Sequence, residues 1–343
     1  MAKGVVRLSD VIVPEIFNPY VQLQTTELST LIQAGVITLD ARLNSNLAGE
    51  GLTFNVPFFK DLDQDEENIS NDDPAVKSTP NKIGTGQEVQ IRLSRNNSWS
   101  SMDLTADLLA HDPMTNIGNR LATYWSLRLQ RAFLSVAQGV FAHSETTPAG
   151  GSTHTAKDLT HDIKGTTFVE GTTTFGGKAF IDTLLTMGDH MGDLSIICVH
   201  SLVYGQMRKN NMIDFIPVSI NGAAQSVPTF QGLQVVVNDN IPVKSDGTVE
   251  SWLFARGAFA LGTGSAKTPT ETWRDPAAGN GSGQEVLFNR VEWALHPVGY
   301  AYIGTAAAGG PNNATLAAAA SWKRVFPERK MIKMARLITR EFK

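Results

Sequence analysis

The longest regular pattern of apolar positions in this chain runs through residues 111–143. Apolar side chains recur there at steps of three and four residues, the spacing that places them along one side of an α-helix. They are Met114, Ile117, Leu121, Trp125, Leu129, Ala132, Val136 and Val140. Asp112 and Pro113 supply a helix start, because proline at the first helical position loses no hydrogen bond. The pattern predicts a helix over residues 112–143, about 45 Å long at ~1.5 Å per residue.

A second apolar row, with Leu127, Leu134 and Phe141 at seven-residue spacing, lies on roughly the opposite side of this helix. We therefore expect the helix to be covered on two sides and to act as a spine. Arg128 falls inside the main apolar stripe, and two interpretations stay open. Either its charged head reaches water along a packed stem, or it makes a specific buried or intersubunit ion pair.

Two stretches alternate with a period of two residues, which is typical of half-buried strands. The apolar members are Leu52, Phe54, Val56 and Phe58 in the first stretch, and Val89, Ile91 and Leu93 in the second. Pro57 restricts the first strand to a sheet edge or to a strand end. The two strands predict a long hairpin with an extended connecting loop.

The loop between these strands has about 28 residues with hardly any apolar content, and loops of this length are usually binding loops or disordered segments. Residues 61–73 contain seven carboxylates and no basic residue: Asp61, Asp63, Asp65, Glu66, Glu67, Asp72 and Asp73. One interpretation is a solvated loop tip whose charges repel one another. The other is a projecting hairpin whose acidic end docks on a neighbour's basic surface.

The rest of the chain predicts an N-terminal arm and a mixed α/β unit. Residues 1–48 contain one short helix, with Leu28, Leu31, Ile32, Val36 and Leu39 as its apolar face. From residue 178 a helical stripe, a strand at 194–199 and a short helix capped by Ser201 follow one another, and helices alternating with strands indicate an α/β domain. Further strands are expected at 233–237, 252–255, 286–295, 298–304 and 329–340.

Composition and charge narrow the class of protein. The 343 residues carry a net charge of −4, which argues against a general nucleic-acid-coating role. Cys198 lies in an apolar strand, so we expect a buried thiol and no disulfide. The N-terminus lacks the apolar run of a signal peptide, and no run approaches the ~18 apolar residues of a membrane span. The sequence predicts a soluble protein made in a reducing compartment, with no membrane partner.

Candidate catalytic and binding motifs are incomplete. Asp61, Asp63 and Asp65 resemble the start of a calcium loop, but Glu66 stands where that loop needs glycine. Residues 262–268 resemble a phosphate loop, but Ala266 stands where glycine must precede the lysine. No GxSxG or HExxH motif occurs. We expect no catalytic residue, no metal, no cofactor and no enzymatic activity. A metal-dependent hydrolase that uses His154, Asp158 and His161 is kept as an alternative, although their spacing is not that of a metal site.

The order of these parts resembles the major capsid proteins of tailed bacteriophages with the Hong Kong 97-type fold, over nearly the whole chain. The matching segments are the hairpin at 49–98, the long helix at 112–143, the helix–strand–helix unit at 178–211, the strand–turn pairs at 230–242 and 253–262, and the last strand at 329–340. The resemblance implies an α+β fold. Its parts would be an N-terminal arm (1–48), an extended β-hairpin loop (49–98), a peripheral domain (99–177) with the spine helix, an axial α/β domain (178–305) and a return to the peripheral domain (306–343).

The resemblance also implies a function: self-assembly into the hexamers and pentamers of an icosahedral head that encloses double-stranded DNA. The partners would be other copies of the chain, a portal, a decoration protein, and DNA held by weak non-specific contact. Because the chain starts almost at the arm, assembly would need a separate scaffolding protein, or none. The protein would be assembled in the host cytoplasm and located in the virion. Lys60, Lys77 and Lys82 are ordinary loop lysines, so no covalent cross-link is predicted. A bacterial nanocompartment shell with the same fold is the second alternative.

A physical argument selects the candidate contact residues. The arm and the hairpin cannot bury their apolar faces at home, and each buried apolar side chain contributes roughly 1.5–3 kcal/mol, which outweighs the cost of ordering an arm. We therefore expect a set of hairpin residues, together with Arg128, to lie at contacts between subunits: Leu52, Phe54, Val56, Phe58, Asp63, Asp65, Glu66, Glu67, Val89, Ile91 and Leu93.

Overall fold

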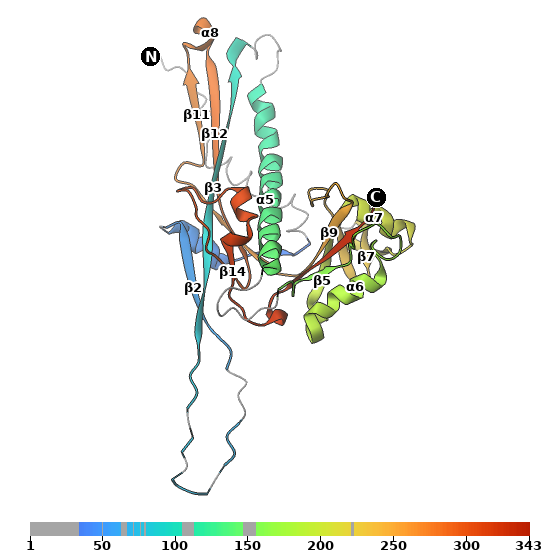
Figure 1. Ribbon diagram of the computed structural model, residues 1–343. Helices are drawn as coiled ribbons and strands as arrows, with labels where there is room; N and C mark the ends of the chain where they lie inside the picture. Colours follow the sequence, from blue (N-terminus) through green and yellow to red (C-terminus); the bar gives the residue numbers. More distant parts are fainter. Residues whose placement is uncertain are drawn as a thin grey trace.

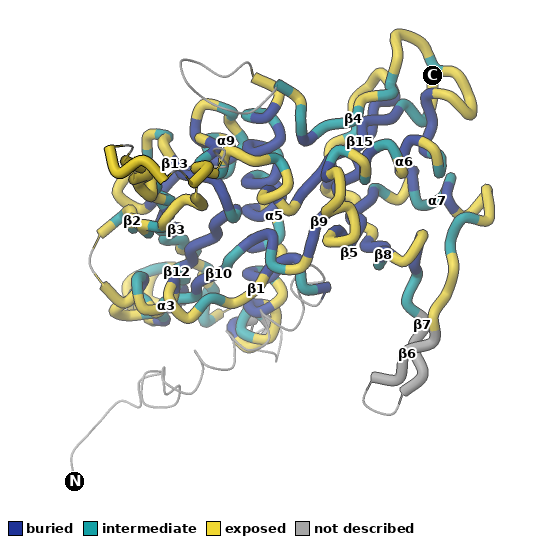
Figure 2. The backbone as a smooth tube through the Cα atoms, turned by 90° about the horizontal axis from the view of Figure 1, so that it is seen from below, coloured by how far each residue is buried: buried dark blue, intermediate teal, exposed yellow. Residues whose placement is uncertain are grey.

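Helix α5 lies between two β-sheets in an elongated molecule (Figure 1). The computed structural model describes residues 34–49, 51–62, 67–70, 72–75, 77–78, 80–104, 113–146, 156–220 and 223–343. The first sheet has six strands in the order β1-β10-β12-β3-β2, with β11 paired to β12. The second has seven strands in the order β4-β15-β9-β5-β8-β7-β6. Seen from below, α5 again separates the two sheets (Figure 2).

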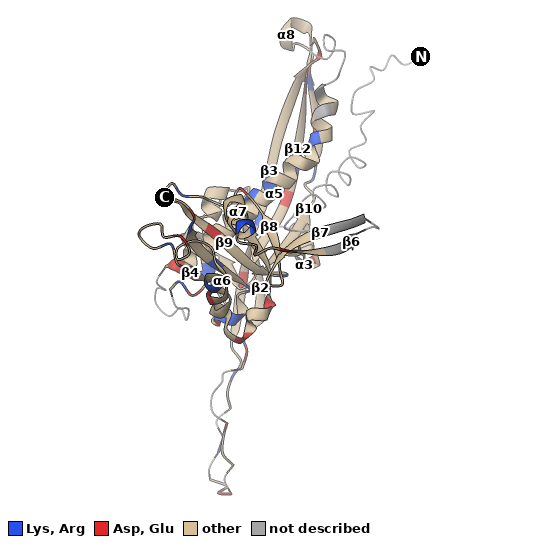
Figure 3. Ribbon diagram, turned by 90° about the vertical axis from the view of Figure 1, so that its right-hand side faces the viewer, with Lys and Arg blue, Asp and Glu red and all other residues tan. Residues whose placement is uncertain are grey.

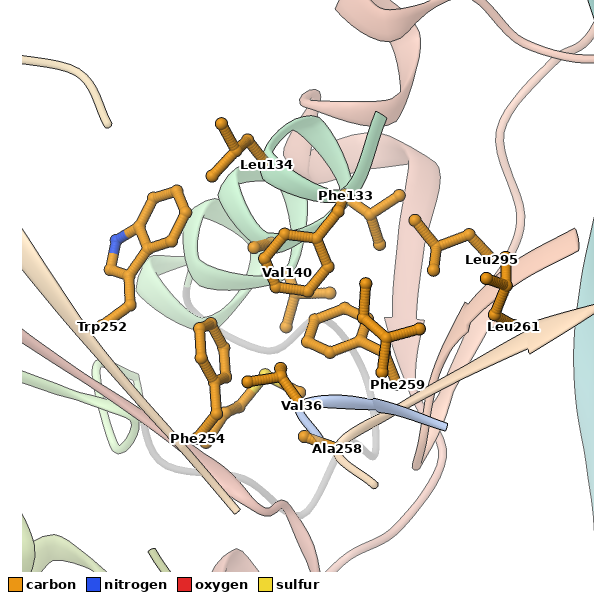
Figure 4. Close-up of a cluster of buried hydrophobic side chains, with 14 of the residues drawn as sticks. Val36, Phe133, Leu134, Val140, Trp252, Phe254, Ala258, Phe259, Leu261 and Leu295 are labelled. Atoms are coloured by element: carbon orange, nitrogen blue, oxygen red, sulfur yellow. The ribbon is translucent and has the colours of Figure 1, made fainter. Parts of the chain in front are cut away.

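Helix α5 spans Pro113–Glu145 and confirms the predicted spine. The main stripe is buried at Met114, Leu121, Trp125, Leu129, Ala132, Val136 and Val140. Phe133 of α5 packs edge-on against Phe254 and Phe259, so one helix joins the cores of both sheets (Figure 4). In the second apolar row, Leu134 and Phe141 are buried but Leu127 is 52% exposed. The expected cover on two sides therefore holds only for the C-terminal half of α5.

The hairpin consists of β2 (Thr53–Phe59) and β3 (Thr85–Met102), which are antiparallel. Directly opposite residues share a face of the sheet, and the register places Phe54 opposite Gln90 and Val56 opposite Glu88. Ile91 lies opposite Thr53, on the other face. The two apolar rows of the hairpin therefore point to opposite sides of the sheet.

Strand β3 continues far beyond the predicted strand and pairs with β12 (Gln284–Pro297) from Arg92 to Met102. The boundary expected between residues 98 and 99 thus falls inside one strand. The other strands of this sheet are β1 (Ile37–Leu39), β10 (Phe259–Gly264) and β11 (Thr270–Asp275), and the short helix α8 (Ala278–Gly281) joins β11 to β12.

The described part of the expected arm packs on this sheet. Strand β1 pairs in parallel with β10, and helix α3 (Ala41–Ala48) buries Leu43 and Leu47 beside it. Residues 37–39 are therefore a strand, where a helix was predicted, because pairing with β10 overrides the local pattern. The rest of that predicted helix, with Leu28, Leu31 and Ile32, lies outside the described residues.

The second sheet confirms the α/β prediction for residues 178–255. Its strands are β4 (Thr160–Asp162), β5 (Leu194–Val199), β6 (Asp214–Ile220), β7 (Ala223–Phe230), β8 (Leu233–Val237), β9 (Thr248–Ala255) and β15 (Met334–Arg340). One face packs on α5, and the other packs on α6 (Gly177–Leu184) and α7 (Ser201–Lys209), with the 3-10 helix η2 (Leu185–Asp193) following α6. The cap of α7 is His200 rather than Ser201, because the imidazole Nδ1 accepts from the Leu202 amide at 3.2 Å.

Two chain crossings correct the expected domain boundaries. After β9 the chain turns at Gly257 and enters β10 of the first sheet, so residues 178–305 do not form one contiguous unit. Conversely, β15 pairs with β9 and β4 in the second sheet, where a return to the peripheral domain was expected. The segment between β12 and β15 includes a two-stranded sheet and contacts α5 through α9 and β14. Its elements are β13 (Tyr300–Tyr302), α9 (Asn313–Leu316), η3 (Ala319–Ser321), β14 (Trp322–Arg324) and η4 (Arg329–Met331).

Candidate assembly surface

The base of the hairpin is fixed to the body by polar and aromatic contacts. On β3, the Glu88 carboxylate lies 3.0 Å from His296 Nε2 and accepts from the Gly299 amide at 2.8 Å. On β2, the Phe58 ring meets the Phe326 ring edge-on, with centroids 5.2 Å apart. The hairpin therefore leaves the body in a defined direction, and its loop extends well beyond both sheets (Figure 1).

An apolar groove opens where the hairpin leaves the body. Phe58, Phe59 and Leu62 line one side, and Phe326 and Met331 line the other. Phe59 is 72% exposed and Leu62 is 70% exposed, so both side chains offer large apolar surfaces to solvent. Sequence reasoning missed them, because the alternation was followed only along the Leu52–Phe58 row. Phe59 continues the opposite row of the same strand, and its neighbour in the pattern, Pro57, drew attention only as a strand breaker.

The predicted contact residues of the hairpin fall into four groups. Ile91 and Leu93 are 2% and 0% exposed within the chain's own core, so they cannot contact a neighbour, and this part of the expectation is wrong. Half-buried positions are Leu52, Phe54, Val56, Phe58 and Val89, and Glu67 is exposed. Asp63, Asp65 and Glu66 lie outside the described residues.

Arg128 is exposed, and its guanidinium lies over the Tyr124 ring, 5.0 Å from the centroid. This cation–π contact keeps the stem on the helix surface while the charge stays in water. In the part of the chain that the structure describes, Arg128 forms no ion pair. The contact agrees with the first of the two interpretations and leaves a partner in another subunit as a proposal.

Of the residues considered for an enzyme, Asp158 is engaged in polar contacts within the subunit. The Asp158 carboxylate pairs with the buried Arg324 guanidinium and accepts from Ser144, His161 lies in β4, and His154 is outside the described residues. Among the described residues, no three His, Cys, Asp or Glu side chains are placed to hold a metal ion. Gly262 belongs to β10, and a Cβ there would lie 2.5 Å from Leu43 Cβ, so residues 262–268 begin in a packed strand rather than in a phosphate loop.

The predicted character of Cys198 is confirmed. The thiol is fully buried in β5, and burial raises its pKa to about 12, because the thiolate is poorly solvated there. Within the described residues, no helix is both long enough and apolar enough to cross a membrane.

Comparison with known proteins decides the family. No family model matches the chain. The major capsid protein of Bacillus phage SPP1 is 37% identical over 332 residues, which cover 95% of this chain and 95% of that protein. This chain belongs to the family of phage major capsid proteins. The resemblance found in the sequence is therefore confirmed, and the capsid protein functions as a structural subunit of a phage head.

Solved structures show the same fold for this capsid protein. The capsid of Ralstonia phage GP4 has a TM-score of 0.57 at 8% identity and covers 92% of this chain and 90% of that one. The capsid of cyanophage Pam1 has a TM-score of 0.55 at 10% identity and covers 93% and 92%. The α+β, Hong Kong 97-type fold is confirmed at the level of the whole chain.

Proposed function

We propose that the capsid protein assembles into hexamers and pentamers that form the icosahedral head of a tailed phage and enclose its double-stranded DNA. The observation that carries this proposal is the 37% identity with a phage major capsid protein along 95% of both chains. The same relationship favours a phage head over a nanocompartment shell.

The hairpin supplies the contact between neighbouring copies. Phe59 and Leu62 are apolar, exposed and placed at its root, while the exposed carboxylates of Glu67 and Asp72 follow them in the loop. Leu52, Phe54, Val56, Phe58 and Val89 keep part of their surface exposed and add to the same contact. Burial of apolar surface at the root of the hairpin supplies affinity for the neighbouring copy. The charges of the loop fix the position in which the two copies meet. Repetition of this contact around a closed shell multiplies its effect.

The further partners follow from this role. Other copies of the chain come first, then a portal, a separate scaffolding protein and a decoration protein. The net charge of −4 favours weak, non-specific contact with the packaged DNA. Assembly takes place in the host cytoplasm, the finished protein resides in the virion, and the chain performs no enzymatic reaction and needs no cofactor.

The test is assembly itself. The purified chain is examined by sedimentation velocity and negative-stain microscopy, alone and with a candidate scaffolding protein. Rings and closed shells are the expected species. Material that stays monomeric under both conditions would overturn the proposal, and metal analysis showing a stoichiometric bound ion would revive the hydrolase alternative.

A further inference from the structure

The hairpin leaves the body of the subunit at one place along its length. Every residue that the structure describes between 67 and 85 is exposed. The chain becomes half-buried at two opposite pairs of β2 and β3, Phe58 with Gly86 and Val56 with Glu88. Among the described residues these pairs are the outermost points at which the body holds the hairpin. Beyond them the loop extends away from both sheets in Figure 1 and, seen from the side, in Figure 3.

Glu88 makes the polar contact between the hairpin and the body. One carboxylate oxygen lies 3.0 Å from His296 Nε2, and the other accepts from the Gly299 amide at 2.8 Å. The side chains of Glu88 and His296 are 13% and 3% exposed. Hydrogen bonds to an ionised carboxylate are stronger than neutral ones, and poor solvation strengthens them further. A single side chain therefore joins β3 to the end of β12 and to the turn that follows it.

Gly299 connects this polar contact to an aromatic one. Its carbonyl oxygen accepts from the Phe326 amide at 3.3 Å, and the Phe326 ring meets the Phe58 ring edge-on. A Cβ on Gly86 would lie 2.5 Å from Phe58 Cζ, so the Phe58 ring rests directly on the opposite strand. The contacts thus form a closed circuit that starts at Glu88 and returns to β3 at Gly86. We call this circuit of five residues the root circuit.

The apolar groove at the root of the hairpin shares two residues with the root circuit. Phe58, Phe59 and Leu62 of the hairpin form one wall of the groove, and Phe326 and Met331 of the body form the other. Phe58 and Phe326 are therefore members of both. Because each wall belongs to a different part of the subunit, a change in the direction of the hairpin changes the distance between the walls. Hairpin direction and groove shape are set together.

We propose that Glu88 is a latch, which holds the hairpin in one direction in the free subunit and so keeps the groove ready to receive a neighbouring copy. The proposal rests on the proposed function and names the residue that prepares the contact before two subunits meet. Glu88 is a positioning residue, since it acts through the hairpin wall of the groove. Release of the latch lowers the apparent affinity between subunits in proportion to the fraction that keeps the competent direction.

Distances in the unassembled subunit test the latch directly. Nitroxide labels at Thr85→Cys, just beyond the latch on β3, and at Lys323→Cys on β14 report the hairpin direction by pulsed electron spin resonance; both positions are exposed. The only native thiol, Cys198, is buried and stays unlabelled. The labelled wild-type subunit should give one narrow distance distribution, and the added substitution Glu88→Ala should give a clearly broader one.

Two controls accompany this measurement. Ser98→Cys with Lys323→Cys places the first label on the same strand but inside the body, so its distance distribution should stay narrow when Glu88→Ala is added. Glu88→Gln should also keep the Thr85–Lys323 distribution narrow. The amide carbonyl accepts the Gly299 N–H, and the amide nitrogen donates to Nε2 of the other imidazole tautomer. A glutamine variant as loose as the alanine variant would contradict a hydrogen-bonded latch.

Assembly tests the consequence. If about a tenth of the Glu88→Ala subunits keep the competent direction, the protein concentration needed for assembly rises roughly tenfold. Glu88→Gln should assemble near the wild-type concentration. Glu271→Ala removes a carboxylate that lies 3.0 Å from Arg290, away from the hairpin, and should have little effect. Circular dichroism and urea unfolding show whether each variant is folded.

The outcomes separate the two proposals. If wild-type chains form no rings or shells, the proposed function fails, and the role of Glu88 in assembly fails with it. If wild-type shells form but Glu88→Ala leaves the Thr85–Lys323 distribution narrow, or broadens it without changing assembly, only this inference is overturned. A broader Ser98–Lys323 distribution in the same variant would also overturn it, because the substitution would then have loosened the whole subunit.

Discussion

Gly139→Ala is a sharp test of how the C-terminal segment packs on the spine. Gly139 lies in the C-terminal half of α5, under α9 and β14. A Cβ at this position would overlap the Leu316 carbonyl oxygen and would lie 2.5 Å from Trp322 Nε1. These two atoms form a buried hydrogen bond, in which the indole donates to the carbonyl at 2.7 Å. The added methyl group would therefore meet a backbone oxygen and a rigid ring, neither of which can move aside freely.

Two effects of opposite sign compete in this substitution. Replacing glycine by alanine inside a helix stabilises by about 0.5–1 kcal/mol. Overpacking a filled core costs about 1–3 kcal/mol, and breaking the Trp322–Leu316 hydrogen bond leaves a buried polar group unpaired at about 1–3 kcal/mol. Taking the middle of each range, we expect Gly139→Ala to lower the free energy of unfolding by about 3 kcal/mol.

The assay is urea unfolding of the unassembled subunit, followed by tryptophan fluorescence, with midpoint and slope compared between variants. Gly205→Ala in α7 is the matched control, because a Cβ there meets nothing within 4 Å. That control should be more stable than wild type by about 0.5–1 kcal/mol. If Gly139→Ala also equals or exceeds wild-type stability, the packing described for α9 and β14 on α5 is refuted.

Three further outcomes follow from other sites. Phe59→Ser should change the free energy of subunit unfolding by no more than about 0.5 kcal/mol, because the Phe59 ring is 72% exposed. In a sedimentation assay the same variant should weaken assembly by about 1.5–3 kcal/mol per contact. Unchanged assembly would remove Phe59 from the interface. Burial raises the pKa of the Cys198 thiol to about 12. At pH 8 the thiol should therefore react with a maleimide roughly a thousandfold more slowly in the folded subunit than in urea. Equal rates would contradict its burial. Hydrogen bonding to Lys330 lowers the pKa of Asp189, so the stability this pair adds is present above the ordinary carboxyl pKa and is lost as the pH falls through the lowered value. Lys330→Ala should raise that pKa in a carboxyl NMR titration, and no change would show that the pair does not form in solution.

The local periodicity of apolar residues predicts much of the fold. The spine helix was predictable because apolar residues that recur with a period near 3.6 residues, after Pro113 as a helix start, fit an α-helix and no other regular structure. The strand at 194–199 was predictable as a short continuous apolar run, and the helix after it from the polar residues at its start. The long course of β3 was not, since residues 94–101 have little apolar alternation. Their extended conformation comes from pairing with β12, which is a partner almost two hundred residues away.

The candidate site was predictable in outline and not in detail. The sequence indicates a long hairpin with an acidic loop, but the face on which each side chain lies depends on the register of β2 against β3. That register puts Phe54 and Ile91 on opposite sides and lets the body of the subunit cover Ile91. The contact between the Trp99 and Tyr124 rings could not be predicted, because these side chains meet only after the sheet and the helix have packed.

Strand β3 is one continuous element that connects two distant edges of the subunit. Its 18 residues span about 60 Å at ~3.3 Å each and run unbroken from the root of the hairpin to the far tip of the first sheet. Glu88 anchors it near one end, where it accepts the Gly299 amide, and the Trp99 ring rests on α5 near the other. If the outer loop contacts a neighbouring copy as proposed, we expect a force on that contact to be transmitted along β3 to the opposite edge of the first sheet.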